Sequence, residues 1–374
     1  MSAAMSTTVY EAPEYVRAIA PYQAGKPIEE LAREFGLDPA RIVKLASNEN
    51  PLGMPASARA AIERAAADLA RYPDANGFAL KQAIAERFGV PLDWITLGNG
   101  SNDILELAAA ALLQPGRSCV YSQYSFAVYA LATQARGARA IVVPAREHGH
   151  DLEAMLAAVA PDTTLMYVAN PNNPTGTYLG AAALEHFLER VPGQVVVVLD
   201  EAYNEYLPPE LRIDTVAWVR RFPNLLVSRT FSKAYGLAGL RVGYGLAQPQ
   251  LTDLLNRVRQ PFNVNSLAQA AAVAALADAD YLARSYELNR AGMRALTEAF
   301  DALGLPYVES HGNFVLVQVG NGARVYQALL ARGVIVRPVG NYGLPGWLRV
   351  SIGLPEENAA FLEALPAALA AARA

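Results

Sequence analysis

Several short segments in the middle of the sequence contain continuous apolar runs rather than an apolar residue at every second position. Three of them are TLMYVAN at 164–170, VVVVL at 195–199 and NLLV at 224–227. A strand reads this way when both of its faces are buried, as in a parallel sheet that carries helices on each side. Stretches with apolar residues at helical spacing, such as 57–72, alternate with these strands. The order of elements therefore predicts an open α/β sheet.

The pattern changes after about residue 265. A long helical stretch is followed by a strand, a helix, two more strands and a last helix, which indicates a smaller α+β unit. The start of the chain is too irregular to form a unit of its own. We therefore expect an N-terminal segment over 1–45 that packs on the small unit and the functional site, a large domain over 46–265, and a small domain over 266–374.

The composition indicates a globular protein without a large surface of one charge. Hydrophobic residues make up 53% of the 374 residues, and the formal net charge is −4. No block of lysine and arginine stands out, so neither nucleic acid nor an anionic membrane is expected as a partner. The N-terminus lacks the basic start and apolar run of a signal peptide, and no stretch of 18 apolar residues occurs. We therefore expect a soluble, cytoplasmic protein.

Cysteine and histidine do not predict a disulfide or a metal site. Cys119 is the single cysteine and lies in the apolar segment SCVYS, where it is expected to be an inert core residue. The histidines are scattered without the spacing of zinc ligands; they are His148, His150, His186 and His311. No metal is therefore expected.

Polar residues follow the ends of the expected strands, and in open parallel sheets ligands bind at that edge. After the strand near 94–97 comes GNGSND, where glycines permit a tight turn and the next helix offers unpaired N–H groups to an anion. In NPNNPTG, Asn173 lies between two prolines and offers a neutral donor and acceptor. Each stretch alone also fits an ordinary turn or a helix cap.

Two further groups of side chains follow the apolar strands. Asp200 and Tyr203 come directly after VVVVL, and a carboxylate there is costly without a cationic partner such as a protonated ring nitrogen, although a helix-capping role fits equally well. Hydroxyls with a guanidinium suit a phosphate, and a partly desolvated lysine suits a Schiff base. The residues of these types after NLLV are Ser228, Thr230, Ser232, Lys233 and Arg241. A ligand with a phosphate, a ring nitrogen, a ring oxygen and an aldehyde satisfies all of these groups, which predicts pyridoxal 5′-phosphate (PLP).

The motifs and their order resemble those of fold-type I, PLP-dependent aminotransferases of the histidinol-phosphate aminotransferase group. The resemblance spans nearly the whole chain and rests on LASNENPLG, RYPD, NPNNPTG, LDEAY, TFSKAYGLAGLRVGY and LRVSIG. It implies a large domain with a mostly parallel seven-stranded sheet flanked by helices, and a small C-terminal α+β domain. It also implies a homodimer in which Tyr72 of RYPD reaches into the partner subunit's site.

The resemblance also implies roles for the residues that bind the cofactor. Lys233 would form the Schiff base and later move a proton between substrate and cofactor. Asp200 would keep the pyridine nitrogen protonated, Asn173 and Tyr203 would bond the phenolic oxygen, and Tyr124 would stack on the ring. The residues implied to hold the phosphate are Gly100, Ser101, Asn102, Thr230, Ser232 and Arg241.

Two arginines near the C-terminus are implied to bind substrate anions. In WLRVSIG, Arg349 alternates with aliphatic residues and so lies on the opposite face of its strand. The resemblance assigns it to the carboxylate of an amino-acid substrate, and assigns Arg337 and Arg349 together to the phosphate of histidinol phosphate. Tyr22 lies in a segment implied to close over the site. The other residues implied to contact the substrate are Asn48, Tyr72 and Asn173.

The implied reaction transfers the amino group of L-histidinol phosphate to 2-oxoglutarate, giving imidazole acetol phosphate and L-glutamate in histidine biosynthesis. An aromatic amino-acid aminotransferase on the same scaffold is the nearest alternative, and decarboxylation of an amino-acid phosphate is a more distant one. A PLP-fold sensor fused to a DNA-binding module would need a basic helix-turn-helix, for which the chain lacks room. A nicotinamide oxidoreductase would need a G-x-G-x-x-G turn after a strand, which is not evident.

Overall fold

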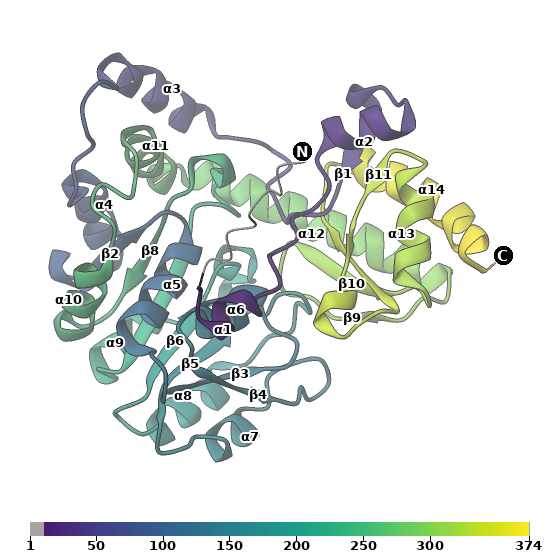
Figure 1. Cartoon of the computed structure of the whole chain (residues 1–374). Coiled ribbons are helices and arrows are strands. Elements are labelled where there is room, and N and C mark those ends of the chain that lie inside the picture. The colour runs from purple at the N-terminus through teal and green to yellow at the C-terminus, as the bar shows by residue number, and fades with distance from the viewer. Residues whose placement is uncertain (1–10, 374) are drawn as a thin grey trace, which may run out of the picture.

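The computed structural model, which describes residues 11–373, is built around a seven-stranded sheet (Figure 1). The strand order is β2-β8-β7-β6-β5-β3-β4, and only β8 runs antiparallel to its neighbours. This confirms the predicted mostly parallel sheet. The strands are β2 Ile95–Gly98, β3 Ser118–Ser122, β4 Arg139–Val143, β5 Thr163–Ala169, β6 Val196–Asp200, β7 Leu225–Thr230 and β8 Gly243–Leu246.

Helices cover both faces of this sheet, because the central strands carry apolar side chains on both sides. In β6, Val197 and Leu199 enter one core, whereas Val196 and Val198 enter the other. The first core receives side chains from α3 Ala56–Ala65, α4 Phe78–Phe88, α7 Leu152–Ala157, α8 Ala181–Arg190, α9 Thr215–Arg221 and α11 Ser266–Ala277. The second core receives them from α5 Ser101–Leu112, α6 Ala127–Ala135 and α10 Pro249–Val258.

A smaller unit with a core of its own follows the large one. Its four-stranded antiparallel sheet has the order β12-β13-β10-β9, and the long helix α12 runs between the two units (Figure 1). The boundary near residue 265 remains a prediction; α11, which follows it, packs its buried alanines into the large core. The elements are β9 Tyr307–Val308, β10 Phe314–Gln318, β12 Arg337–Pro338, β13 Trp347–Ser351, α12 Ala279–Ala302, α13 Gly322–Leu330 and α14 Pro355–Arg373.

The N-terminal segment contacts both units. Helix α1 Glu14–Arg17 packs on α6, and α2 Ile28–Phe35 leads to strand β1 Val43–Lys44. Strand β1 pairs in parallel with β11 Val334–Ile335. The residues after β1 therefore lie between the small unit and the carboxyl ends of the large sheet.

Strand β8 was not expected from the sequence, because it contains two glycines. One of them, Gly243, lies where a Cβ atom would come 2.7 Å from the carbonyl carbon of Gly100 and 2.8 Å from the carbonyl oxygen of Arg229. Only glycine fits such a close approach of backbone to backbone. The glycine thereby lets the start of α5 approach the end of β7, where several of the predicted functional residues lie.

Candidate active site

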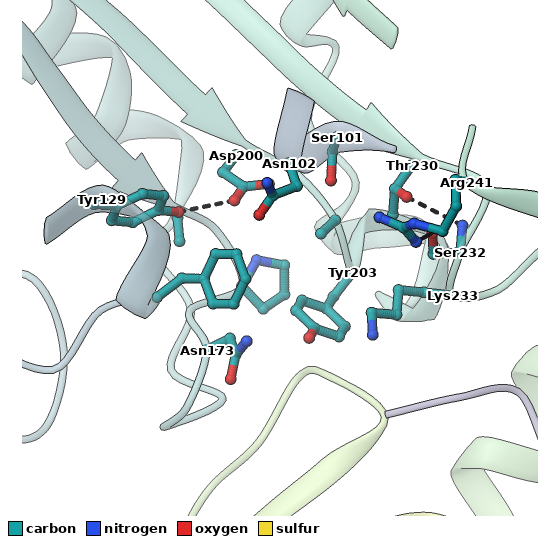
Figure 2. A pocket seen from close by; sticks show the side chains of 14 residues that line it. Ser101, Asn102, Tyr129, Asn173, Asp200, Tyr203, Thr230, Ser232, Lys233 and Arg241 are labelled. Carbon is teal, nitrogen blue, oxygen red and sulfur yellow. Dashed lines mark hydrogen bonds between the residues drawn. The ribbon is translucent and has the colours of Figure 1, made fainter. Parts of the chain in front are cut away.

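A cavity opens at the carboxyl ends of β5, β6 and β7, next to the start of α5 (Figure 2). This is the edge at which open parallel sheets bind ligands. Nine of the predicted residues line it together, namely Ser101, Asn102, Asn173, Asp200, Tyr203, Thr230, Ser232, Lys233 and Arg241. The other lining residues are Phe126, Tyr129, Ala169, Pro171 and Ala202, none of which was predicted to contact a ligand.

Asp200 ends β6 as a buried carboxylate with one satisfied oxygen. Its Oδ2 accepts a hydrogen bond of 2.8 Å from the hydroxyl of Tyr129 (Figure 2). The ring of Tyr129 stacks on Tyr167 with centroids 4.4 Å apart. Its Oδ1 is buried and has no hydrogen-bond partner within the part of the chain that the structure describes. Burial raises the pKa of Asp200 to about 6, while the Tyr129 hydrogen bond opposes this rise. The free oxygen therefore suits a cationic N–H group of a ligand.

Lys233 follows β7 in a tight turn, and its amine lies inside the protein. The Nζ atom donates to the carbonyl oxygen of Ser47 at 3.0 Å. Burial, together with the charge of Arg349, lowers the pKa of Lys233 to about 7. A large fraction of the amine is therefore neutral near pH 7, which is the form that attacks a carbonyl carbon.

The start of α5 and the loop after β7 form a pocket of hydrogen-bond donors. Gly100 precedes α5 with φ = 85° and offers no capping side chain, so the first N–H groups of the helix remain available to a ligand. This positive φ favours glycine at position 100, and the guanidinium of Arg241 lies directly beside it. Arg241 in turn donates to Ser232 Oγ at 3.3 Å. These donors suit a phosphate group.

Two buried arginines lie side by side above the cavity on the small unit. Arg337 and Arg349 are register partners on β12 and β13. Arg349 donates to Asn173 Oδ1 at 2.6 Å and to the carbonyl oxygen of Ala46 at 2.7 Å. Neither arginine forms an ion pair with another of the described residues. Buried charges are normally paired, so this arrangement indicates an anionic ligand.

Tyr22 and Asn48 border the cavity without lining it. The guanidinium of Arg337 lies over the ring of Tyr22, 5.7 Å from its centroid, and donates to the carbonyl oxygen of Gln23 at 2.6 Å. Asn48 donates from Nδ2 to the hydroxyl of Tyr203 at 2.9 Å. The N-terminal segment therefore reaches Arg337 and the wall of the cavity.

Two of the predicted residues lie away from this cavity. Tyr124 is outside the lining, packed near His148 and Trp347, whereas Phe126 occupies the wall two residues later. Tyr72 is 81% exposed and stacks on Phe262, with ring centroids 4.6 Å apart. Within a single chain, Tyr72 therefore does not contribute to the wall of the cavity.

The lining fits PLP when it is compared with the chemical groups of that cofactor. The unpartnered Oδ1 of Asp200 matches a protonated pyridine nitrogen, and the donors at the start of α5 with Arg241 match a phosphate. The amine of Lys233 matches an aldehyde, and the hydroxyl of Tyr203 matches a phenolic oxygen.

Residues 11–373 contain no group of three side chains that could together bind a metal ion. No helix in this part of the chain has the length and hydropathy of a membrane span.

The fold and the site define a PLP-dependent enzyme that acts on amino groups, and the chain belongs to the aminotransferase class I and II family. The model of this family matches residues 40–365. Both the predicted cofactor and the predicted reaction class are thereby confirmed.

Similar proteins and solved structures identify a group within this family. The chain is 73% identical over 366 residues to histidinol-phosphate aminotransferase 2 of Ralstonia nicotianae, covering 97% of this chain and 98% of that protein. It is 72% identical to histidinol-phosphate aminotransferase 1 of Cupriavidus pinatubonensis, covering 96% of each chain. A crystal structure of histidinol-phosphate aminotransferase from Sinorhizobium meliloti in complex with PLP superposes with a TM-score of 0.90 at 29% identity, covering 97% of this chain and 99% of that one. The predicted histidinol-phosphate aminotransferase group is confirmed, and the aromatic aminotransferase alternative is not supported.

Proposed function

We propose that this chain converts L-histidinol phosphate and 2-oxoglutarate into imidazole acetol phosphate and L-glutamate, in the cytoplasm. The observation that carries the proposal is the buried pair Arg337 and Arg349, which has no carboxylate partner among the described residues. Two guanidinium groups suit a doubly charged phosphate better than a single carboxylate. The relatives that share up to 73% of the sequence carry the name of this activity.

The residues of the cavity would hold PLP by its two polar ends. When bound, PLP supplies an aldehyde that takes up the amino group and a pyridine ring that draws electrons from the neighbouring carbon. The start of α5, with Thr230, Ser232 and Arg241, would hold the phosphate. Asp200 would face the ring nitrogen, and Phe126, which lines the cavity, would stack on the ring.

Lys233 would act as the base of the reaction. Its amine has a pKa lowered to about 7 by burial, so it accepts a proton from the substrate carbon without first losing one to solvent. Once protonated, Lys233 could pass the same proton to a carbon of the cofactor. The hydrogen bond to the carbonyl oxygen of Ser47 holds the amine in place when it is free.

Asp200 would keep its negative charge opposite the ring nitrogen. Tyr129 donates to one of its oxygens and thereby favours the ionised form that burial disfavours. On the opposite side of the cavity, Asn173 is held by Arg349, and Tyr203 is held by Asn48. The residues that would contact the cofactor are thus tied to those that would contact the substrate.

We also propose that the chain acts as a homodimer in which Tyr72 completes the site of the partner subunit. The ring of Tyr72 is 81% exposed and is held away from its own cavity by stacking on Phe262. Mixing a Lys233→Ala chain with a Tyr72→Ala chain tests this. Each variant alone should be impaired, but a mixed dimer contains one site with both wild-type residues and should recover activity. Absence of recovery in verified mixed dimers would refute a role for Tyr72 across the interface.

The choice of donor is tested by absorbance of the purified, PLP-loaded protein without an acceptor. Histidinol phosphate and phenylalanine are added separately, and loss of the visible cofactor band is followed against concentration. Bleaching at low histidinol phosphate, with a much weaker response to phenylalanine, is expected because Arg337 and Arg349 both meet the phosphate. Equal or better bleaching by phenylalanine would refute the proposed donor.

A further inference from the structure

An ion pair is buried on the face of the large sheet opposite the cavity. Arg229 Nε donates to Glu201 Oε2 at 2.8 Å, and the hydroxyl of Thr215 donates to the same oxygen at 3.0 Å. The two charged side chains are 7% and 4% exposed. The guanidinium also lies over the ring of Phe88, 5.0 Å from its centroid. Strand β7, strand β6, helix α9 and helix α4 thus meet at one polar cluster.

Stability alone is a weak reason for such a pair. Removing two charges from water costs much of what their attraction returns, and apolar residues of similar size often stabilise a core equally well. Most of the surroundings are apolar, because Val197, Leu199 and Val227 belong to the core on this face, and the polar groups near the guanidinium besides Glu201 and Thr215 are the hydroxyl of Tyr244 and the carboxylate of Glu205. A gain in stability therefore does not explain why this ion pair is buried at the ends of β6 and β7.

The pair lies directly behind the residues that face the cavity. Glu201 follows Asp200, and Arg229 precedes Thr230, and adjacent residues of a strand point to opposite faces. The last registered pair of β6 and β7 is Asp200 with Ser228, and beyond it Glu201 N donates to Ser228 O at 2.9 Å. After this point, β6 enters the turn with Tyr203 and β7 enters the turn with Lys233. The ion pair is therefore the side-chain link between the two strands at the point where their ladder ends.

We propose that Glu201 and Arg229 are positioning residues for the cofactor site. They hold the ends of β6 and β7 at a fixed separation, so that Asp200 on one strand and Thr230 with Lys233 on the other meet the two ends of one rigid ligand. A rotation or slip of one strand end would move its group relative to the other, and a ligand held at both ends would lose one contact. The inference rests on the proposed placement of PLP in this cavity.

The test separates a loss of positioning from a loss of stability. In Glu201→Leu/Arg229→Met both charges of the pair are replaced by apolar side chains, while the carboxylate of Glu205, which Arg229 also stabilises, keeps the charge of Arg212 nearby. Leu184→Ala is the control, because Leu184 is buried in the same core on α8 and lies outside the cavity wall. Thermal midpoint, the dissociation rate of PLP, and kcat and KM for histidinol phosphate are measured for each.

If the pair positions the strand ends, the double variant should release PLP at least about fivefold faster than the wild type. Its kcat should fall by a similar factor with little change in KM, because Arg337 and Arg349 are untouched. Leu184→Ala should keep the wild-type release rate even where its thermal midpoint is lower. An unchanged release rate and kcat in a folded double variant would overturn the inference and leave the pair as a stabilising contact.

Arg229→Lys serves if the double variant does not fold. It retains the positive charge, but an amine replaces the planar guanidinium that reaches both Glu201 and Thr215. Faster PLP release than in the wild type is expected, and an unchanged rate would again overturn the inference. Because PLP release needs no amino donor, a wrong choice of donor leaves this result unaffected.

Discussion

Tyr129→Phe removes the one hydrogen bond that the structure gives to the carboxylate of Asp200 from another side chain. The hydroxyl donates to Oδ2 at 2.8 Å in a fully buried site. Phenylalanine keeps the ring, which stacks on Tyr167 at a centroid distance of 4.4 Å and an angle of 3°. The substitution therefore changes the bond and leaves the packing in place.

The expected loss of PLP affinity follows from the type of hydrogen bond that Tyr129→Phe removes. A hydrogen bond to a charged group contributes about 1.5–3 kcal/mol, and each 1.4 kcal/mol corresponds to about a tenfold change in an equilibrium constant. Burial already raises the pKa of Asp200 to about 6, and the Tyr129 bond opposes that rise. Without it, the pKa of Asp200 rises further, so less carboxylate is ionised near neutral pH. PLP should then bind about 10- to 100-fold more weakly at pH 7.

The assay is titration of cofactor-free protein with PLP between pH 6 and 8.5, with kcat measured at saturating cofactor. Tyr167→Phe is the matched control, because it removes a hydroxyl from the stacked partner, where the bond of 2.8 Å goes to the carbonyl oxygen of Leu105. That variant should lose about 1 kcal/mol of stability with unchanged PLP affinity. Equal PLP affinity in Tyr129→Phe and the wild type would refute the role given to the Tyr129 bond.

Three further substitutions test other parts of the site. Lys233→Ala should abolish turnover while PLP still binds noncovalently, and turnover at the wild-type rate would contradict its role. Burial lowers the pKa of Lys233 from 10.5 to about 7, so the unfolded chain binds more protons than the folded chain between these pH values. The free energy of unfolding of the cofactor-free wild type, measured by urea titration, should therefore rise from pH 7 to 10.5. This rise should be smaller in Lys233→Ala. Arg349→Ala should raise KM at least about tenfold for both donor and acceptor, since a bond to a charged group is lost in each, and unchanged KM values would exclude it from anion binding. Gly243→Ala should destabilise the protein by about 1–3 kcal/mol and weaken PLP binding, because its Cβ meets Gly100 and Arg229; a wild-type urea midpoint would contradict this.

The large sheet could be predicted because the residue pattern of its strands reflects which of their faces are buried. Continuous apolar runs such as VVVVL occur where both faces are buried, and the structure shows β6 between two cores. Strand β8 was missed for the opposite reason. Its glycines are selected by the closeness of other backbone segments, as at Gly243, and such contacts depend on residues far away in the sequence.

The site was predictable only where the chemistry follows a strand end. Asp200 and Lys233 come directly after apolar strands, and the structure brings them to one cavity. The wall residues Phe126 and Tyr129 were not expected, although both follow β3 and lie three positions apart at the start of a helix. This spacing places them on one helical face, but the sequence does not show where the helix begins. It therefore does not show that Phe126, rather than Tyr124, turns toward the cavity.

The pairing of β1 with β11 has a consequence for the time at which the site can form during synthesis. Asn48 N donates to the side chain of Ser351, which lies 303 positions later in the chain, and Arg349 reaches back to the carbonyl oxygen of Ala46 over the same separation. A ribosome adds about 5–20 residues per second, so this early segment waits roughly 15–60 s for its partners. The large sheet can assemble in that interval, whereas the contacts of Ala46 and Asn48 beside the cavity form only when β13, the last strand of the chain, has emerged.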